Sequence, residues 1–236
     1  LFLGDVPGGS GKRPNGPSPH GHGQMKGSVF SAFRTLVTER YGAGLWSESL
    51  QTAGAESAIY LPLESYPDEV LARIAAAVSV ARGEPLDDLL FALGRHLATQ
   101  LHRSHPTLFR SGRTAEQIAR LLGSPPEPKA VGYLDLLPLR FETSGSGELL
   151  ARFGGVAPLC MLAKGVISGM AREANERVAV FENQCQKRGA PACVLRLVFA
   201  KVSEPAVASA GVPGALDGDD ITVISSDRRN ARRRGT

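Results

Sequence analysis

The stretch LPLRFETSGSGELLARF, residues 137–153, determines the fold class of the C-terminal half. Apolar residues alternate with other residues on both sides of a Ser-Gly turn. An apolar period of two is typical of a β-strand with one buried face, and a glycine-rich turn between two such runs predicts a hairpin. The alternating apolar positions are Leu137, Leu139 and Phe141 before the turn, and Leu149, Ala151 and Phe153 after it.

The residues after this hairpin predict a helix and then two more strands. Residues 158–172, PLCMLAKGVISGMAR, are apolar at helical spacing and are interrupted by glycines, which is typical of a helix packed on a sheet. Alternating apolar residues return in residues 178–182 and 193–199, with a turn at 188–191 between them. The order ββαββ predicts an antiparallel sheet with one helix across a face.

The N-terminal half, residues 25–123, has a helical pattern instead. Apolar residues recur there at steps of three and four, beginning with Val29, Phe30 and Phe33. Pro67 and Pro85 mark helix starts, and Gly42 and Gly123 mark helix ends. We therefore predict an α+β protein with a helical subdomain at residues 25–123, a proline-rich hinge at 124–128 and a ββαββ subdomain at 129–200.

Both ends of the chain have the composition of linkers. Residues 1–24 are rich in Gly and Pro, and residues 201–236 return to Pro, Gly, Ser and charged residues. The net charge of +4 is small, and the strongest basic run is the arginine cluster at residues 228–234. We expect both ends to be disordered. An arginine-rich end of this kind is more often solvated than bound, so we do not expect a nucleic-acid partner.

Composition excludes several classes of protein. The 236 residues are 42% hydrophobic, which is enough for a core, and the apolar runs are too short to span a membrane. Three cysteines fit a reducing cytoplasm better than a secreted, disulfide-linked protein. The sequence contains no recognisable combination of nucleophile, base and acid, so we expect a cytoplasmic protein that is not an enzyme.

Several motifs in the helical half occur together at the spacing of a known family. Met25-Lys26-Gly27 and Tyr66-Pro67-Asp68-Glu69, with Trp46 and Gly94-Arg95, resemble bacterial heme nitric oxide/oxygen binding (H-NOX) domains. The resemblance extends over residues 25–200. It implies a helical distal and a mixed proximal subdomain that clamp a heme, a gas such as NO or O2 as ligand, and a separate signalling partner protein.

The chain departs from this family at the heme site. The family holds the iron with one proximal histidine, but here that place falls on Pro126 or a neighbour in PPEPK. The family's Tyr-x-Ser-x-Arg propionate clamp falls on Phe153, Gly155 and Ala157. A heme protein needs an axial donor and a clamp for two carboxylates, so the resemblance predicts a degenerate heme site.

The same resemblance identifies pocket-lining residues and leaves one heme-binding alternative open. Val29 and Phe33 match the distal pocket of the family, and with Phe153 they are the predicted lining of a pocket for a small ligand. The alternative is a functional heme gas sensor that uses His102 or His105 as a non-standard axial ligand. The opposing interpretation is that both are surface or boundary histidines.

The C-terminal half also resembles 4-vinyl reductase-type ligand-binding domains. There the residues matching Cys160, Glu182, Cys185 and Cys193 hold a structural zinc, and three thiolates with a carboxylate can form a tetrahedral zinc site. Two other interpretations stay open: three thiols packed as small hydrophobic residues, or a redox pair formed by Cys185 and Cys193. The predicted function is a sensory module that binds a small ligand.

Overall fold

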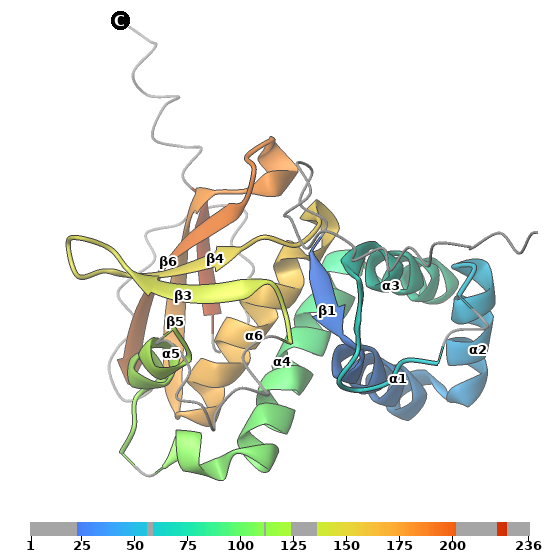
Figure 1. Cartoon of the computed structure of the whole chain (residues 1–236), viewed down its shortest axis with the longest axis horizontal. Coiled ribbons are helices and arrows are strands. Elements are labelled where there is room, and N and C mark those ends of the chain that lie inside the picture. The colour runs from blue at the N-terminus through green and yellow to red at the C-terminus, as the bar shows by residue number, and fades with distance from the viewer. Residues whose placement is uncertain (1–22, 56–58, 111, 124–135, 202–220, 226–236) are drawn as a thin grey trace, which may run out of the picture.

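The computed structural model describes residues 23–55, 59–110, 112–123, 136–201 and 221–225. A helical lobe and a sheet lobe lie side by side, with α4 and α6 between them (Figure 1). The predicted α+β class and the order ββαββ are confirmed. The helices are α1 (Gly27–Tyr41), α2 (Ala43–Thr52), α3 (Asp68–Arg82), α4 (Leu86–Ser104), α5 (Ala115–Gly123) and α6 (Cys160–Glu173).

The helical lobe is built around apolar stripes that face one core. In α1, Val29, Phe30 and Phe33 are fully buried, as the spacing predicts. Phe30 stacks on Tyr60 with ring centroids 4.2 Å apart, and Phe33 meets Trp46 of α2 edge-on. Because Asp68 and Glu69 occupy the first turn of α3, carboxylates lie at the positive end of that helix.

Two short paired strands lie directly before α1 and α3, and the sequence pattern did not predict them. Strand β1 (Gln24–Lys26) pairs antiparallel with β2 (Ser65–Pro67). The backbone N–H of Asp68 also donates to the carbonyl oxygen of Gly23 at 3.1 Å. The predicted boundary after residue 24 is therefore wrong by at least two residues, because Gly23 and Gln24 belong to the folded lobe.

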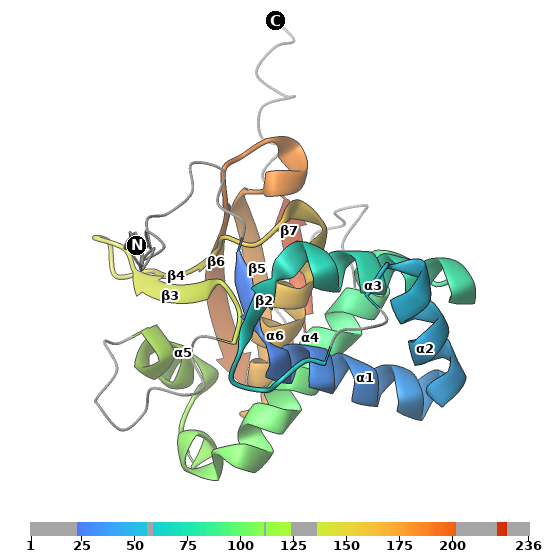
Figure 2. The same cartoon turned by 45° about the vertical axis from the view of Figure 1, so that its right-hand side comes forward.

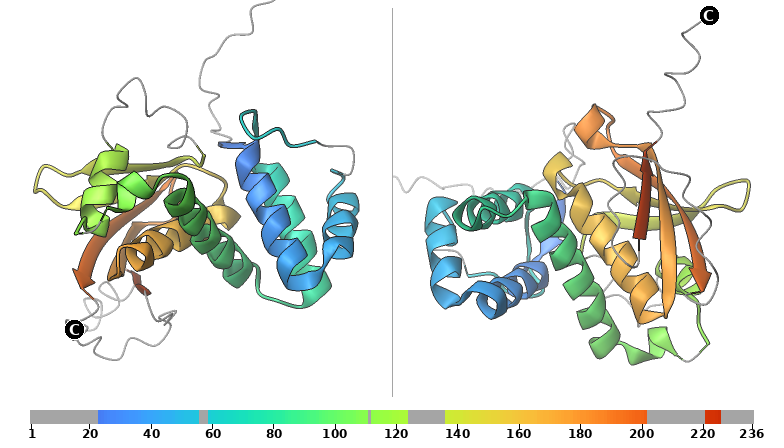
Figure 3. Two further views of the ribbon diagram at one scale, coloured as in Figure 1. Left: turned by 90° about the horizontal axis from the view of Figure 1, so that it is seen from below. Right: turned by 180° about the vertical axis from the view of Figure 1, so that it is seen from behind.

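The sheet lobe has five strands in the spatial order β3-β4-β6-β5-β7, with α6 on one face. Figure 2 shows α5 beside β3 at one edge of this sheet. Helix α6 is buried along nearly its whole length, because the sheet and α4 cover opposite sides of it (Figure 3). The strands are β3 (Leu139–Thr143), β4 (Leu149–Phe153), β5 (Glu176–Gln184), β6 (Cys193–Lys201) and β7 (Ile221–Ser225).

Strand β7 corrects the prediction for the C-terminal tail. Ile221–Ser225 was expected to be disordered, but it pairs with β5, and Ile221 is buried opposite Val178. The pairing is parallel, so the sheet is not purely antiparallel as predicted. The physical reason is that a short β-branched segment completes the edge of β5 and covers apolar side chains there.

No helix within the described ranges has both the length and the apolar character needed to cross a membrane.

Candidate functional site

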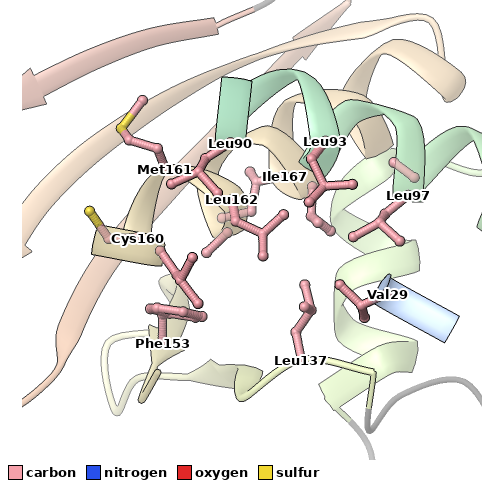
Figure 4. Close-up of a cluster of buried hydrophobic side chains, with 14 of the residues drawn as sticks. Val29, Leu90, Leu93, Leu97, Leu137, Phe153, Cys160, Met161, Leu162 and Ile167 are labelled. Carbon is pink, nitrogen blue, oxygen red and sulfur yellow. The ribbon is translucent and has the colours of Figure 1, made fainter. Parts of the chain in front are cut away.

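The three predicted pocket-lining residues are part of the packed core. Val29, Phe33 and Phe153 are all fully buried. Figure 4 shows Val29 and Phe153 within one cluster of buried apolar side chains from α1, α4 and α6 and the chain between them. Phe33 instead contacts Trp46, with ring centroids 5.7 Å apart. The structure therefore brings Val29 and Phe153 into one apolar cluster and turns Phe33 toward α2.

A small apolar pocket lies beside this cluster, between α4, α6 and β3. Its volume is about 60 Å³, whereas pockets for small-molecule ligands usually have about 300–1,000 Å³. None of the three predicted lining residues forms its wall. The residues that do include Leu97, Leu101, Leu137, Phe141, Val166 and Met170.

The segment matching the propionate clamp cannot hold carboxylates in this arrangement. The Phe153 ring is buried, and Gly155 and Ala157 offer no polar side chain. A Cβ atom on Gly155 would lie 2.4 Å from Cζ of Phe153 and 2.9 Å from Oδ2 of Asp68. Both distances are shorter than normal packing allows, so the buried Phe153 ring leaves space only for a glycine at position 155.

The described histidines have other partners. His102 Nδ1 lies 2.6 Å from Glu173 Oε2, and its ring packs on Phe109 with centroids 4.5 Å apart. His105 Nδ1 lies 2.9 Å from Ser104 Oγ, and His96 is bonded to Gln100. None of these histidines lines the apolar pocket. The position matching the proximal histidine, Pro126, lies outside the described residues, and no histidine follows His105 in the sequence.

Three observations on the described residues bear on whether a heme could be held in the family's manner. The apolar pocket has a volume of about 60 Å³, positions 153, 155 and 157 carry no polar side chain, and each described histidine lies within hydrogen-bonding distance of another polar group.

A second cluster contains all three cysteines. Cys160 begins α6, Cys185 follows β5, and Cys193 begins β6, so the turn between β5 and β6 carries two thiols to the helix start. All three are buried and free, and their sulfur atoms lie within 4.8 Å of one another. The Sγ atoms of Cys185 and Cys193 are 4.0 Å apart. The cluster can hold a soft metal ion by its thiolates, or it can pack as reduced thiols.

The fourth predicted ligand, Glu182, is not part of this cluster. Its carboxylate forms a buried ion pair with Lys164 of α6 and accepts a 2.7 Å bond from Arg188. Burial raises the pKa of Glu182, but the two cations outweigh it and hold the pKa below its usual range. The prediction of Glu182 as a metal ligand therefore does not agree with this arrangement, because both carboxylate oxygens already have cationic partners.

Hydrogen bonds link the three thiols: Cys193 accepts from Cys160 and donates to Cys185. The hydrogen bond to Cys193 and burial both raise the pKa of Cys160. The bond from Cys160 lowers the pKa of Cys193, which also accepts the backbone N–H of Gln186 at 3.3 Å. Cys193 therefore loses its proton more readily than Cys160, and a thiolate is the form that binds metals.

The sequence pattern did not identify Lys164 as a site residue, although its position within an apolar run is unusual for a charged side chain. It is the one charged residue in the apolar run from Leu159 to Ala171, so its burial required an acidic partner on the sheet.

Similarity to solved structures defines the class of fold. An H-NOX protein from S. oneidensis, solved in its Fe(II)NO state, aligns with a TM-score of 0.61 at 19% identity, covering 75% of this chain and 100% of that one. An unliganded Fe(II) H-NOX mutant from K. algicida aligns with a TM-score of 0.60 at 18% identity, covering 76% and 98%. At this identity the likeness shows the fold alone: the chain has the H-NOX fold.

The family match covers the helical half of the chain. Residues 26–123 match the Haem-NO-binding family, so the resemblance drawn from Met25-Lys26-Gly27 and Tyr66-Pro67-Asp68-Glu69 is confirmed. The chain thus has the H-NOX fold, and its helical half is similar to the Haem-NO-binding family. None of the curated proteins compared with the chain matches it. The resemblance to 4-vinyl reductase-type domains stays a prediction.

Proposed function

We propose that this protein is a cytoplasmic, non-catalytic sensory module of the H-NOX type whose heme site is degenerate. The observation that carries the proposal is Phe153, which is fully buried at the first clamp position. Its ring occupies the space that a side chain on Gly155 would need. Binding of two propionates requires charged or polar donor side chains, and Phe153, Gly155 and Ala157 supply none.

Signal transfer from such a module to a separate partner protein is supported by the position of α4. This helix packs on α1 and α3 of the helical lobe and on α6 of the sheet lobe (Figure 1). A ligand that binds the two lobes more tightly in one relative arrangement would shift the population toward it. We propose that a small molecule or gas acts in this way, and that the partner binds the favoured arrangement.

Titration of the purified full chain with hemin tests the degenerate site. The expected result is only the broad absorption of loosely associated hemin, without a Soret band that saturates at one equivalent. A sharp, saturating Soret band with an iron-histidine stretching signature would overturn the proposal. A heme-binding H-NOX protein treated identically is the positive control.

The alternative is a functional gas sensor that uses His102 or His105 as axial ligand. It requires His102 to leave Glu173 and Phe109, and the close contact to Glu173 argues against this. If hemin does bind in the titration, the His102→Ala and His105→Ala double variant decides. Loss of the Soret band would support this alternative, and a retained band would exclude both histidines.

A second candidate function is a structural zinc site, favoured by the convergence of three buried thiols. We propose Cys160, Cys185 and Cys193 as the ligands, with the fourth position taken by a group other than Glu182. Zinc content of the chain purified without chelators is the measurement. We expect Cys193→Ser to lose the metal and Glu182→Gln to retain it.

Circular dichroism of both variants separates loss of the metal from loss of the fold. A folded original chain that contains no zinc would identify the cluster as packed thiols. Loss of zinc in folded Glu182→Gln as well would restore the carboxylate as a ligand. The second outcome would contradict the position of Glu182 described above.

A further inference from the structure

A polar groove lies on the side of α4 that the apolar pocket does not reach. Its volume is about 570 Å³, which is within the range of small-molecule sites. Helix α4 forms most of it, flanked by α1 on one side and α6 on the other (Figure 1). The lining residues outside α4 are Thr35 and Glu39 from α1 and Arg172 from α6.

Close contact between α4 and α6 fixes one wall of the groove relative to its floor. A Cβ atom on Gly169 would lie 2.5 Å from Cβ of Ala98 and 3.0 Å from Cα of Arg95. Gly94 and Gly165 face each other at the same crossing, where a Cβ atom on either would lie 3.0 Å or less from the opposite backbone. The two helices cannot slide without collisions, so the backbone of α6 near Arg172 is held in a fixed position relative to α4.

The lining is cationic. Arg95, Arg103 and Arg172 line the groove, and Glu39 is the only acidic residue in its lining. Arg172 Nη2 donates to Thr99 Oγ1 at 3.3 Å and lies 3.7 Å from Glu173 Oε1. Glu173, which does not line the groove, also forms hydrogen bonds with Thr99 and His102. The groove therefore retains an excess of positive charge.

The floor adds neutral hydrogen-bonding groups. His96 is half-buried, and burial lowers its pKa, which favours the neutral ring near pH 7. Its Nε2 accepts a bond from Gln100 Nε2 at 2.9 Å, so the ring proton lies on Nδ1 and is a donor. Half-buried Phe91 and Ala92 supply apolar contact at one end. Cations, a neutral donor and an apolar floor are the groups expected of a site for an organic anion.

From this arrangement we infer that the groove is a binding site for a small anion that carries phosphate or carboxylate groups. Guanidinium groups bind both kinds of oxyanion in a bidentate manner, and three arginines line this groove. The inference does not depend on heme or zinc. The groove shares no lining residue with the thiol cluster or with the apolar pocket, although α4 and α6 contribute to both the groove and that pocket.

Titration of the ¹⁵N-labelled full chain with pyrophosphate, and separately with citrate, tests the inference. The expected result is saturable shifts of the amide signals in α4 and at Arg172. The probe that binds more tightly distinguishes a phosphate-bearing from a carboxylate-bearing ligand. Arg103→Gln should weaken binding about tenfold, because charge-assisted hydrogen bonds to one guanidinium are lost.

The matched control is Arg152→Gln. Arg152 lies on β4 in an exposed ion pair with Glu142, away from the groove, so its removal should leave the affinity unchanged. The inference fails if neither anion gives saturable shifts in the groove. It also fails if Arg103→Gln and Arg152→Gln weaken binding equally, since that would indicate attraction by overall charge alone.

Discussion

Oδ2 of Asp68 accepts a hydrogen bond from the backbone N–H of Val156 at 2.8 Å, and this bond joins the first turn of α3 to the segment between β4 and α6. Asp68 is fully buried, and its Oδ1 has no hydrogen-bond partner among the described residues. Ala157 follows directly, at the position where the family resemblance expects an arginine. No ion pair to this buried carboxylate is found among the described residues.

This relationship predicts a pH-dependent stability. Burial raises the pKa of Asp68 to about 6. The folded state therefore binds the Asp68 proton more tightly than the unfolded state does, and protonation of Asp68 stabilises the fold. This stabilisation is fully present below the unfolded pKa, near 4, and is lost as the pH rises through the folded pKa, near 6. Asp68→Asn should stabilise the protein at pH 7 by on the order of 2 kcal/mol and have little effect at pH 4.

Urea unfolding at both pH values measures this difference. Asp88→Asn is the control, because Asp88 is an exposed carboxylate in the first turn of α4. An equal effect of the Asp68 substitution at pH 4 and pH 7 would show that its carboxyl group does not titrate in this range.

The buried pair of Lys164 and Glu182 predicts a large loss on removal of one partner. Lys164→Met leaves a buried carboxylate with only Arg188, and we expect the free energy of unfolding to fall by about 3 kcal/mol. Removing both charges with Lys164→Met and Glu182→Leu should recover most of this loss, because no uncompensated charge remains. Because folding lowers the pKa of Glu182, the ionised carboxylate stabilises the fold at neutral pH. This stabilisation should be lost as the pH falls through the lowered pKa of Glu182.

Urea unfolding of the single and double variants decides this prediction. Arg152→Met, which breaks the exposed pair with Glu142, should cost less than about 1 kcal/mol. A double variant as unstable as Lys164→Met would mean that packing around the lysine stem, and not the charge, is responsible.

The contact between α4 and α6 predicts that Gly94 tolerates no side chain. A Cβ atom there would lie 2.3 Å from the carbonyl oxygen of Leu162, a backbone atom that cannot rotate away. Gly94→Ala should lower the free energy of unfolding by at least about 2 kcal/mol. Gly44 in α2 is the matched control, since a Cβ atom there meets nothing within 4 Å. Gly44→Ala should leave stability unchanged or raise it by less than about 1 kcal/mol, and thermal unfolding compares the two.

Strand β7 predicts that part of the C-terminal tail contributes to stability. Ile221→Asn places a polar group where a side chain is 4% exposed, opposite Val178, and should cost about 2 kcal/mol in urea unfolding. Thr222→Ser, at the partly exposed neighbouring position, should have little effect. Equal stability of the Ile221 variant and the original chain would show that β7 does not hold to the sheet in solution.

The sequence alone determined the elements whose signal is local. Apolar periodicity predicted the helices of residues 25–123 and the hairpin around SGSG. The spacing of Met25-Lys26-Gly27 and Tyr66-Pro67-Asp68-Glu69 predicted the resemblance to the Haem-NO-binding family, whose model matches residues 26–123. These features depend on neighbours a few residues apart, so the order of residues carries them directly.

Only the tertiary structure decided which side chains meet. Glu182 has a ligand's chemistry, but the burial of Lys164 beneath it commits its carboxylate to an ion pair and leaves three thiols as the cluster. The pairing of Ile221–Ser225 with β5 and the meeting of Asp68 with Val156 join segments 43 and 88 positions apart. Charge compensation in a buried space and closure of a sheet edge depend on what the fold brings alongside, and no local pattern records that.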